Sequence, residues 1–107
     1  MKALALVTAV LAAAGTPIAG AADLPGAERR AALVHMLKHD CGSCHGMTLK
    51  GGLGPSLRPA AIAAKGDELL VATVLHGRPG TAMPPWRPFL SEAEARWLVG
   101  MLREGLD

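Results

Sequence analysis

Apolar residues recur at steps of three or four positions in the first part of the chain, which is the spacing of one face of a helix. This stripe ends at the first cysteine, and the charged side chains of Arg29, Arg30 and Lys38 fall outside it. We therefore expect a first helix with one buried face. The residues of the expected stripe are Ala31, Val34, Leu37 and Cys41.

Two further helices have start and stop signals. The segment from about Asp67 to His76 begins with two acidic residues and is followed by Gly77, a common helix stop. Before the last helix, Ser91 and Glu94 have the spacing of a capping box, in which each side chain binds the other residue's free backbone N–H. The apolar side of this last helix is expected to consist of Trp97, Leu98, Met101 and Leu102.

The pattern favours an all-α fold, with three main helices joined by loops rich in Gly and Pro. No stretch alternates cleanly between apolar and polar residues, and β-branched residues are few, so no strand is expected. Half of the 107 residues are apolar, but there is no Tyr, one Phe and two Trp. A chain this small cannot build a large aromatic core of its own, so we expect a bound group to fill its middle.

The first residues have the three-part layout of a secretory signal. Lys2 is followed by an uncharged apolar run over residues 3–14 and then by the small residues 19–22. This run of about a dozen residues is shorter than the roughly 20 of a permanent membrane span. We therefore expect a signal in residues 1–22, cleaved at its end, and one periplasmic domain in residues 23–107. An uncleaved membrane anchor is the alternative.

The charge of the chain is nearly balanced. The formal net charge is +2, and it falls to +1 without Lys2, because ten basic and nine acidic residues remain. This balance provides no basic face for a nucleic acid, so no nucleic-acid partner is expected. The two cysteines lie three positions apart, which is too close to staple distant parts of a small domain.

The chemistry of the chain is concentrated in residues 41–45, Cys-Gly-Ser-Cys-His. Two thiols at this spacing can add to the two vinyl groups of one haem, and the histidine that follows is then held under the iron. A thiol–disulfide oxidoreductase uses the same cysteine spacing after a strand, and no strand is expected here. A structural zinc site needs four ligands, and there is no second cysteine pair. We therefore expect covalent haem c on Cys41 and Cys44, with His45 as an iron ligand.

A second iron ligand is expected from the loop over residues 80–85, Gly-Thr-Ala-Met-Pro-Pro. Its two prolines restrict the backbone, so Met83 can be presented at a small entropic cost. His76, beside Gly77, is the main rival, although it also suits a helix C-terminus. Ordinary packing, loop or surface positions are expected for Met36, Met47, Met101, His35 and His39.

The loop over residues 51–57 contains three glycines, so its backbone can run close to a flat group. A carbonyl in this loop is expected to accept a hydrogen bond from the second ring nitrogen of His45, which would fix the orientation of the ring. The loop is not a phosphate-binding loop, because no Gly-Lys-Ser/Thr follows it.

Three motifs together resemble class I monohaem cytochrome c. They are residues 41–45, residues 54–57 (Gly-Pro-Ser-Leu) and residues 83–86 (Met-Pro-Pro-Trp) before the final helix. The resemblance covers nearly all of the chain after the signal. It implies three helices around one covalent haem, a crossing of the first and last helices, and histidine and methionine as axial ligands. It also implies that the carbonyl of Pro55 accepts a hydrogen bond from the haem histidine.

The longer runs over residues 40–55 and 76–86 are most similar to the small cytochrome c55X group, encoded with cytochrome cd1 nitrite reductase in denitrifying bacteria. This resemblance implies an electron-transfer protein, not an enzyme. Its partner would be the nitrite reductase or a protein that makes haem d1. The alternatives are an electron donor to another periplasmic oxidase or dehydrogenase, and a five-coordinate haem sensor or peroxidase-like protein.

Three further expectations concern the surroundings of the haem. Trp86, next to the methionine loop, is expected to pack against the haem, and the alternative is that it only closes the core. The long loop before the last helix makes either a monomer or a dimer with exchanged helices conceivable. Five basic residues are candidates for steering an acidic redox partner, although the sequence does not assign them to one face. They are Lys38, Lys50, Arg58, Arg78 and Arg87.

Overall fold

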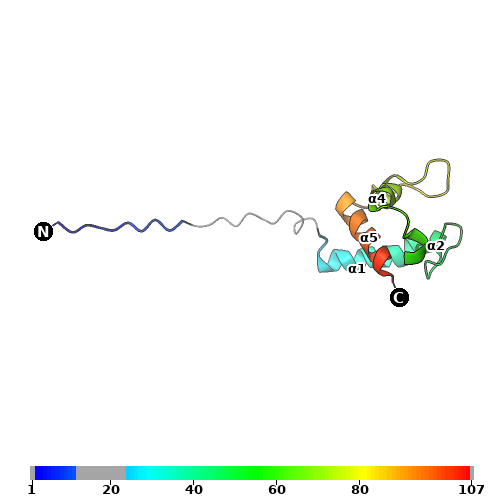
Figure 1. Cartoon of the computed structure of the whole chain (residues 1–107), viewed down its shortest axis with the longest axis horizontal. Coiled ribbons are helices and arrows are strands. Elements are labelled where there is room, and N and C mark those ends of the chain that lie inside the picture. Colours follow the sequence, from blue (N-terminus) through cyan, green and yellow to red (C-terminus); the bar gives the residue numbers. More distant parts are fainter. Residues whose placement is uncertain (1, 12–23, 107) are drawn as a thin grey trace.

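The structure, a computed structural model, describes residues 2–11 and 24–106. Within these ranges the chain forms helices and no strand, so the expected all-α fold is confirmed. The predicted signal cleavage site lies outside the described residues. None of the helices in the described part of the chain is long and apolar enough to cross a membrane. The helices are α1 (Ala27–Met36), the π-helical segment η1 (Leu37–Cys41), α2 (Gly42–His45), α3 (Pro59–Ile62), α4 (Asp67–His76) and α5 (Glu92–Glu104) (Figure 1).

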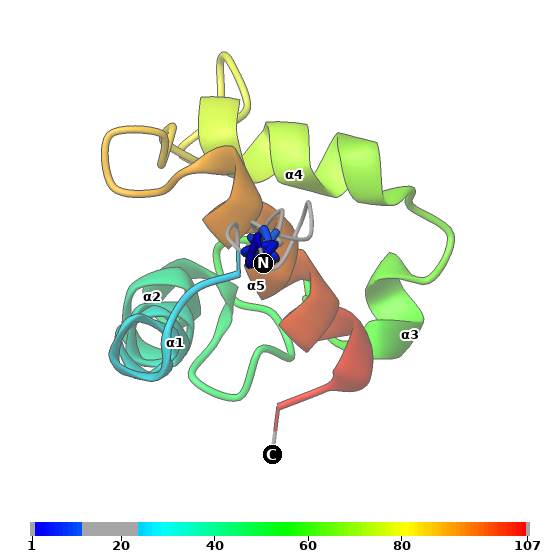
Figure 2. The same ribbon diagram turned by 90° about the vertical axis from the view of Figure 1, so that its left-hand side faces the viewer.

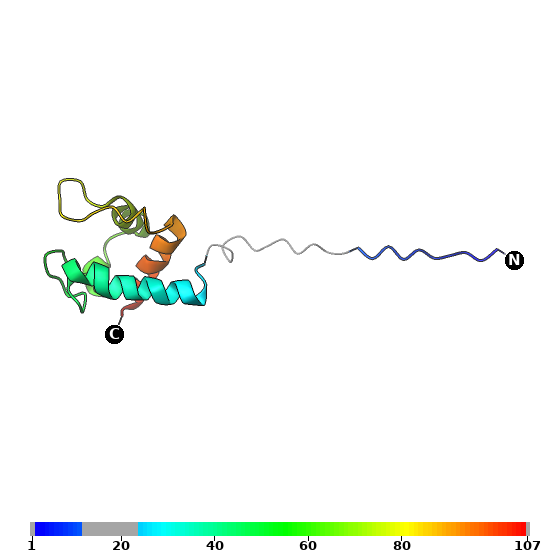
Figure 3. The ribbon, with the colours of Figure 1, turned by 180° about the vertical axis from the view of Figure 1, so that it is seen from behind.

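The last helix, α5, is the centre of the domain. It contacts α1, α3 and α4 (Figure 2). Seen from behind, α1 and α5 cross, as the resemblance to cytochrome c implies (Figure 3). Arg29 joins the two helices at this crossing: its guanidinium donates to the carboxylate of Glu94 and, over 2.9 Å, to the carbonyl oxygen of Phe89.

The ends of α4 and α5 agree with the sequence signals. Helix α4 spans the segment expected for it, and Gly77 follows it with a φ of 66°, a conformation that favours glycine. At the start of α5, Glu94 donates its backbone N–H to the Ser91 hydroxyl over 3.0 Å. The Ser91 N–H donates in turn to the Glu94 carboxylate over 3.0 Å. The predicted capping box is therefore confirmed.

The apolar stripe predicted for the first helix was wrong in one position. Ala31 is exposed, whereas Leu33 is completely buried and Leu37 is 2% exposed. Leu33 and Leu37 lie four residues apart, on the same face of the helix. Ala31, two residues before Leu33, lies about 200° around the helix axis, on nearly the opposite side. The helix therefore turns a different face to the core than the spacing of Ala31 suggested.

The hydrophobic core surrounds a cavity rather than filling the middle of the domain. Eight of the eleven buried core residues come from α3, α4, α5 and the residue Leu90 that precedes α5. The core residues that also line the cavity are Leu37, Ile62, Leu90, Leu98, Val99 and Leu102. The fold thus places six of its eleven buried core side chains around a space that the described residues leave open.

Candidate functional site

Both cysteines of the Cys-Gly-Ser-Cys-His motif line this cavity, together with His45 and Met83. Its volume is about 490 Å³, which lies in the range of small-molecule and cofactor sites. Its walls are mainly apolar and come from η1, α2, α3, α4, α5 and the segments that connect α2 to α3, α3 to α4, and α4 to α5. The residues predicted to attach a haem and to bind its iron therefore face a common space.

His45 is held in a fixed orientation. Only 9% of the residue is exposed, and its ring nitrogen Nδ1 lies 2.7 Å from the carbonyl oxygen of Pro55. A carbonyl can only accept, so Nδ1 carries the proton and donates it in this hydrogen bond. This tautomer leaves the other ring nitrogen, Nε2, with a free lone pair for a metal ion.

Gly54 forms one side of the cradle around the His45 ring. A Cβ atom at this position would lie 2.7 Å from Cε1 and 2.8 Å from Nδ1 of the imidazole, closer than real Cβ atoms approach other atoms. The same segment is tied to the motif through its backbone, because the Gly54 N–H donates to the carbonyl of Cys44 over 2.8 Å. Gly51 donates in the same way to the carbonyl of His45, also over 2.8 Å. The glycine loop is thus folded directly onto the histidine, and this close approach requires glycine at position 54.

The two thiols differ in their surroundings. Cys44 is exposed at the edge of the cavity, whereas Cys41 is partly buried. The pKa of the Cys41 thiol is raised to about 11, mainly by burial and secondly by the negative charge of Asp40. Both cysteines are free thiols rather than a disulfide, as attachment to a cofactor requires.

Among the residues considered as a second iron ligand, Met83 is the one that lines the cavity. It is half-buried, in the loop between α4 and α5. Its main rival, His76, is exposed at the end of α4 and is not part of the cavity wall. The other candidates also lie outside the wall: Met36, Met47, Met101, His35 and His39.

Trp86 and the basic residues named from the sequence differ in whether they line the cavity. Trp86 lines the cavity, and its backbone N–H donates to Val74 of α4 over 3.0 Å. Of the five basic residues named from the sequence, Arg78 is part of the cavity wall and the other four are not. Lys65 also lines it, although no sequence pattern distinguished this residue from other surface lysines. The chain path over α3 and the start of α4 brings Lys65 to the wall.

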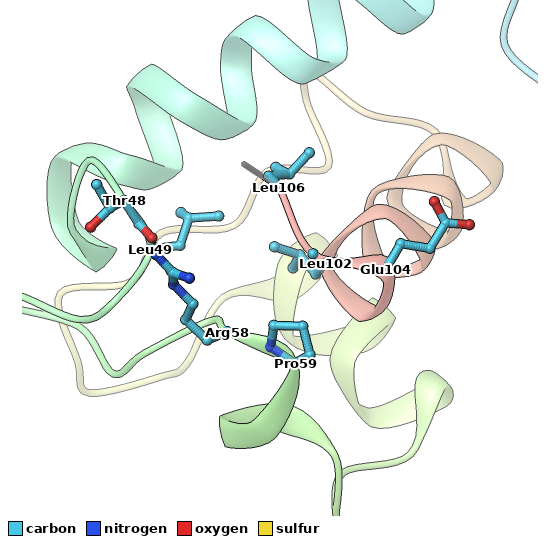
Figure 4. A pocket seen from close by; sticks show the side chains of 8 residues that line it. Thr48, Leu49, Arg58, Pro59, Leu102, Glu104 and Leu106 are labelled. Atoms are coloured by element: carbon cyan, nitrogen blue, oxygen red, sulfur yellow. Dashed lines mark hydrogen bonds between the residues drawn. The ribbon is translucent and has the colours of Figure 1, made fainter.

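A second, smaller pocket lies between residues 48–49, residues 58–59 and the end of α5 (Figure 4). Its volume is about 230 Å³, and its wall contains no cysteine, histidine or methionine. Arg58, one of the residues around it, donates through Nε to the carbonyl of Thr48 over 3.1 Å. This pocket lacks groups that could attach a haem or bind its iron, so the larger cavity is the candidate site.

The larger cavity fits a covalently attached haem. It supplies two thiols with two residues between them, the sequence spacing of haem attachment, together with an imidazole whose Nε2 is free and apolar walls for a porphyrin. Gly54 and the carbonyl of Pro55 orient the imidazole, and most metal-binding histidines are oriented in the same way by a hydrogen bond from their other ring nitrogen.

Comparison with known proteins gives the same answer. The sequence model of the family described as "Cytochrome C oxidase, cbb3-type, subunit III" matches residues 25–100. The chain is 59% identical over 90 residues to cytochrome c55X of Pseudomonas aeruginosa, an alignment that covers 83% of this chain and 76% of that protein. It is 47% identical over 102 residues to cytochrome c55X of Paracoccus denitrificans, covering 95% of this chain and 94% of that protein.

Two further similarities concern a solved structure and a larger protein. The c-type cytochrome NirC has 59% sequence identity and a TM-score of 0.73, covering 75% of this chain and 94% of its own. The dihydro-haem d1 dehydrogenase of Pseudomonas aeruginosa is 34% identical over 67 residues, which are 63% of this chain but 14% of that protein. The fold, the motif and these relatives lead to one conclusion: the chain belongs to the cytochrome c55X family of c-type cytochromes, whose cofactor is covalently bound haem c.

Proposed function

We propose that this chain is an exported cytochrome that carries single electrons on a haem with His45 and Met83 as its two axial ligands. The observation that supports the proposal is that these two side chains and both motif cysteines line one cavity. When bound, haem c supplies a reversible one-electron change of its iron. If His45 and Met83 both held the iron, the group would supply electron transfer and would offer no site on the metal for a substrate.

Each residue of the site has a distinct role in this proposal. Cys41 and Cys44 form the two thioether bonds, and His45 binds through Nε2. The carbonyl of Pro55, 2.7 Å from Nδ1, holds the imidazole in the tautomer and orientation that binding needs. Trp86, part of the cavity wall, packs against the cofactor and keeps water away from it.

The protein surroundings raise the reduction potential of such a site. A thioether sulfur favours the ferrous state, and apolar walls disfavour the additional charge of the ferric state. The walls of this cavity are mainly apolar, with six of the eleven buried core residues among them. We therefore infer a cytochrome that is readily reduced and gives up its electron to an acceptor of higher potential.

We propose a haem d1 dehydrogenase as the electron donor. The relative named dihydro-haem d1 dehydrogenase contains a segment similar to this chain that makes up 14% of its length. Dehydrogenation removes two electrons and two protons from its substrate, and a haem iron accepts one electron at a time. Two molecules of this cytochrome, or two successive encounters, therefore complete one turnover.

Donation of electrons to cytochrome cd1 nitrite reductase is the second candidate. The apolar cavity supports it, because the raised potential suits a donor to a terminal reductase. The two candidates differ in the direction of electron flow. The first reduces the ferric cytochrome, and the second oxidises the ferrous cytochrome.

Stopped-flow spectroscopy of the purified holoprotein distinguishes these candidates. The ferric protein is mixed with the dehydrogenase and dihydro-haem d1, and the ferrous protein is mixed with nitrite reductase and nitrite. Rapid reduction in the first mixture supports the role in haem d1 formation, and rapid oxidation in the second supports the role in nitrite reduction. If neither reaction exceeds the rate without the partner enzyme, both proposed partners are wrong.

The ligand set is tested by two matched variants. We expect Met83→Ala to abolish the near-infrared sulfur-to-iron charge-transfer band of the ferric protein and to allow rapid binding of carbon monoxide to the ferrous protein. His76→Ala should change neither, because His76 lies outside the cavity wall. A wild-type protein that lacks the band and binds carbon monoxide promptly would instead support the five-coordinate alternative.

We also propose that residues 1–22 are removed during export to the periplasm. The support is the composition of the segment, a basic start followed by an apolar run and small residues. The intact mass of the protein from the periplasmic fraction tests this: it should equal that of residues 23–107 plus one haem. A mass that retains the first 22 residues would support a membrane anchor instead.

A further inference from the structure

The segment that carries Met83 is closed by its own backbone hydrogen bonds. Thr81 donates its N–H to the carbonyl of Arg78 over 3.0 Å, and between them lie Pro79 and then Gly80, with a φ of 77°. These residues and this hydrogen bond are those of a type II turn. Arg78 in turn donates its N–H to the carbonyl of Met83 over 3.2 Å. The two ends of the segment therefore meet, and Met83 lies at the closing end.

The Thr81 side chain connects the turn to the methionine. Its hydroxyl donates to the carbonyl of Arg78 over 2.7 Å and accepts the N–H of Met83 over 3.3 Å. A hydroxyl has one proton to donate and two lone pairs to accept with, so it makes both bonds at once. No other side chain in the described part of the chain hydrogen-bonds to the Met83 backbone.

The other side of the Met83 backbone rests on the end of α4. A Cβ atom at Gly77 would lie 2.7 Å from the carbonyl oxygen of Met83, so the two backbones are in direct contact. The Met83 backbone is thus held at its N–H by Thr81, at its carbonyl by Arg78, and from behind by Gly77. Thr81 and Met83 both line the cavity.

We propose that Thr81 is a positioning residue for Met83, whose hydroxyl holds the methionine backbone so that the thioether stays directed at the site that His45 faces. This inference rests on the proposed ligand role of Met83. A held backbone leaves only the methionine side chain to be ordered when the sulfur binds, so the bound arrangement costs less conformational entropy. Without the hydroxyl, the segment opens more often and the position beside the iron becomes accessible.

The expected size of the effect follows from the value of one hydrogen bond. Removing one changes an equilibrium about 2- to 10-fold. The groups freed by the substitution lie at the surface, where water can replace the lost partner, so the fold should persist. The effect should therefore appear in ligand access rather than in overall stability.

Carbon monoxide binding to the reduced holoprotein measures this access. We expect Thr81→Val to bind carbon monoxide about fivefold faster than the wild type, and Thr81→Ser, which keeps the hydroxyl, to bind at the wild-type rate. Thr48→Val is the matched control, because Thr48 lies outside the wall of this cavity and the hydroxyl bonded to the Met83 backbone belongs to Thr81. It should leave the rate unchanged. Thr81→Ala replaces Thr81→Val if the latter yields no holoprotein.

The ferric charge-transfer band provides a second measurement. In Thr81→Val the band should disappear on heating at a lower temperature than in the wild type, while helix content is still intact. Equal rates and equal band stability in Thr81→Val and the wild type would overturn the inference, as would acceleration by Thr81→Ser or Thr48→Val. If the wild type has no band and Met83→Ala binds carbon monoxide no faster, the proposed methionine ligand is wrong, and the role of Thr81 fails with it.

Discussion

Gly54 lies against the His45 ring so closely that a single additional carbon would come within 2.7 Å of the imidazole. The contact joins the glycine loop to the motif histidine, and the neighbouring Pro55 carbonyl accepts from the same ring. The orientation of the proposed iron ligand therefore depends on the absence of a side chain at a position nine residues further along the chain.

The contact predicts a large effect of Gly54→Ala. The added methyl group must displace the ring or the loop, and overpacking of this kind costs about 1–3 kcal/mol of stability. We expect a lower yield of holoprotein and a lower midpoint of denaturant unfolding. Gly100→Ala is the matched control, because no atom lies within 4 Å of its Cβ position on α5. That change should stabilise the protein by about 0.5–1 kcal/mol. Equal effects of the two substitutions would contradict the prediction.

Substitutions at Gly77 and Gly80 distinguish two reasons for a glycine: a left-handed backbone conformation and close contact with a neighbouring backbone. Both have positive φ, 66° and 77°, but a Cβ atom at Gly77 would strike the Met83 carbonyl, whereas the space at Gly80 is open. Gly80→Ala should cost about 1–2 kcal/mol for the left-handed conformation alone. Gly77→Ala should cost more and should also weaken the ferric charge-transfer band. The prediction fails if Gly80→Ala disturbs the band as much as Gly77→Ala.

The pairing of Arg29 and Glu94 predicts a stability change in acid. The pKa of the Glu94 carboxyl lies below its usual value, mainly because Arg29 donates a hydrogen bond to it and secondly because the backbone N–H of Ser91 does so. A depressed folded-state pKa adds stability above the unfolded-state pKa, and this stability is lost as the pH falls through the folded-state pKa. Wild type and Glu94→Gln should therefore differ most near neutral pH and converge in acid.

Denaturant unfolding between pH 7 and pH 3 measures this convergence. Glu68→Gln provides the comparison: the pKa of the Glu68 carboxyl is also lowered, by Arg96, but the Glu68 side chain is 82% exposed, against 18% for Glu94. Surface pairs contribute little, so its unfolding curve should follow the wild type more closely. A gap between wild type and Glu94→Gln that stays constant with pH would mean that the carboxylate charge is not responsible.

Removal of the haem should destabilise the whole domain. A closed apolar cavity costs about 24 cal/mol per Å³, so 490 Å³ would correspond to about 12 kcal/mol. This value is an upper bound, because the cavity is open to solvent at the exposed residues Cys44 and Leu53. It is as large as the total stability of a typical small domain. We expect Cys41→Ala/Cys44→Ala, which cannot attach haem, to lose most of its helical circular dichroism and its cooperative melting. A cooperative melt near the holoprotein's temperature would contradict this expectation.

Local features of the fold follow directly from local sequence. Helix α4 and the capping box of α5 depend on residues no more than a turn or two apart, and their signals are confirmed. The attachment motif likewise needs only five consecutive residues, because thioether bonds bring the histidine to the iron wherever the segment lies. The burial of Leu33 in place of Ala31 was missed, because it depends on how α1 is rotated against α5.

The chain's own residues determined that it is helical and that residues 41–45 carry its chemistry, since propensity, capping and covalent attachment act over short distances. Only the tertiary structure decided which distant groups share the cavity with His45: Met83 rather than His76, together with Trp86, Arg78 and Lys65. It also decided that the Pro55 carbonyl meets the histidine ring. These relationships depend on the paths of two long loops, and those paths are set by the packing of α1 and α4 against α5, which no local pattern encodes.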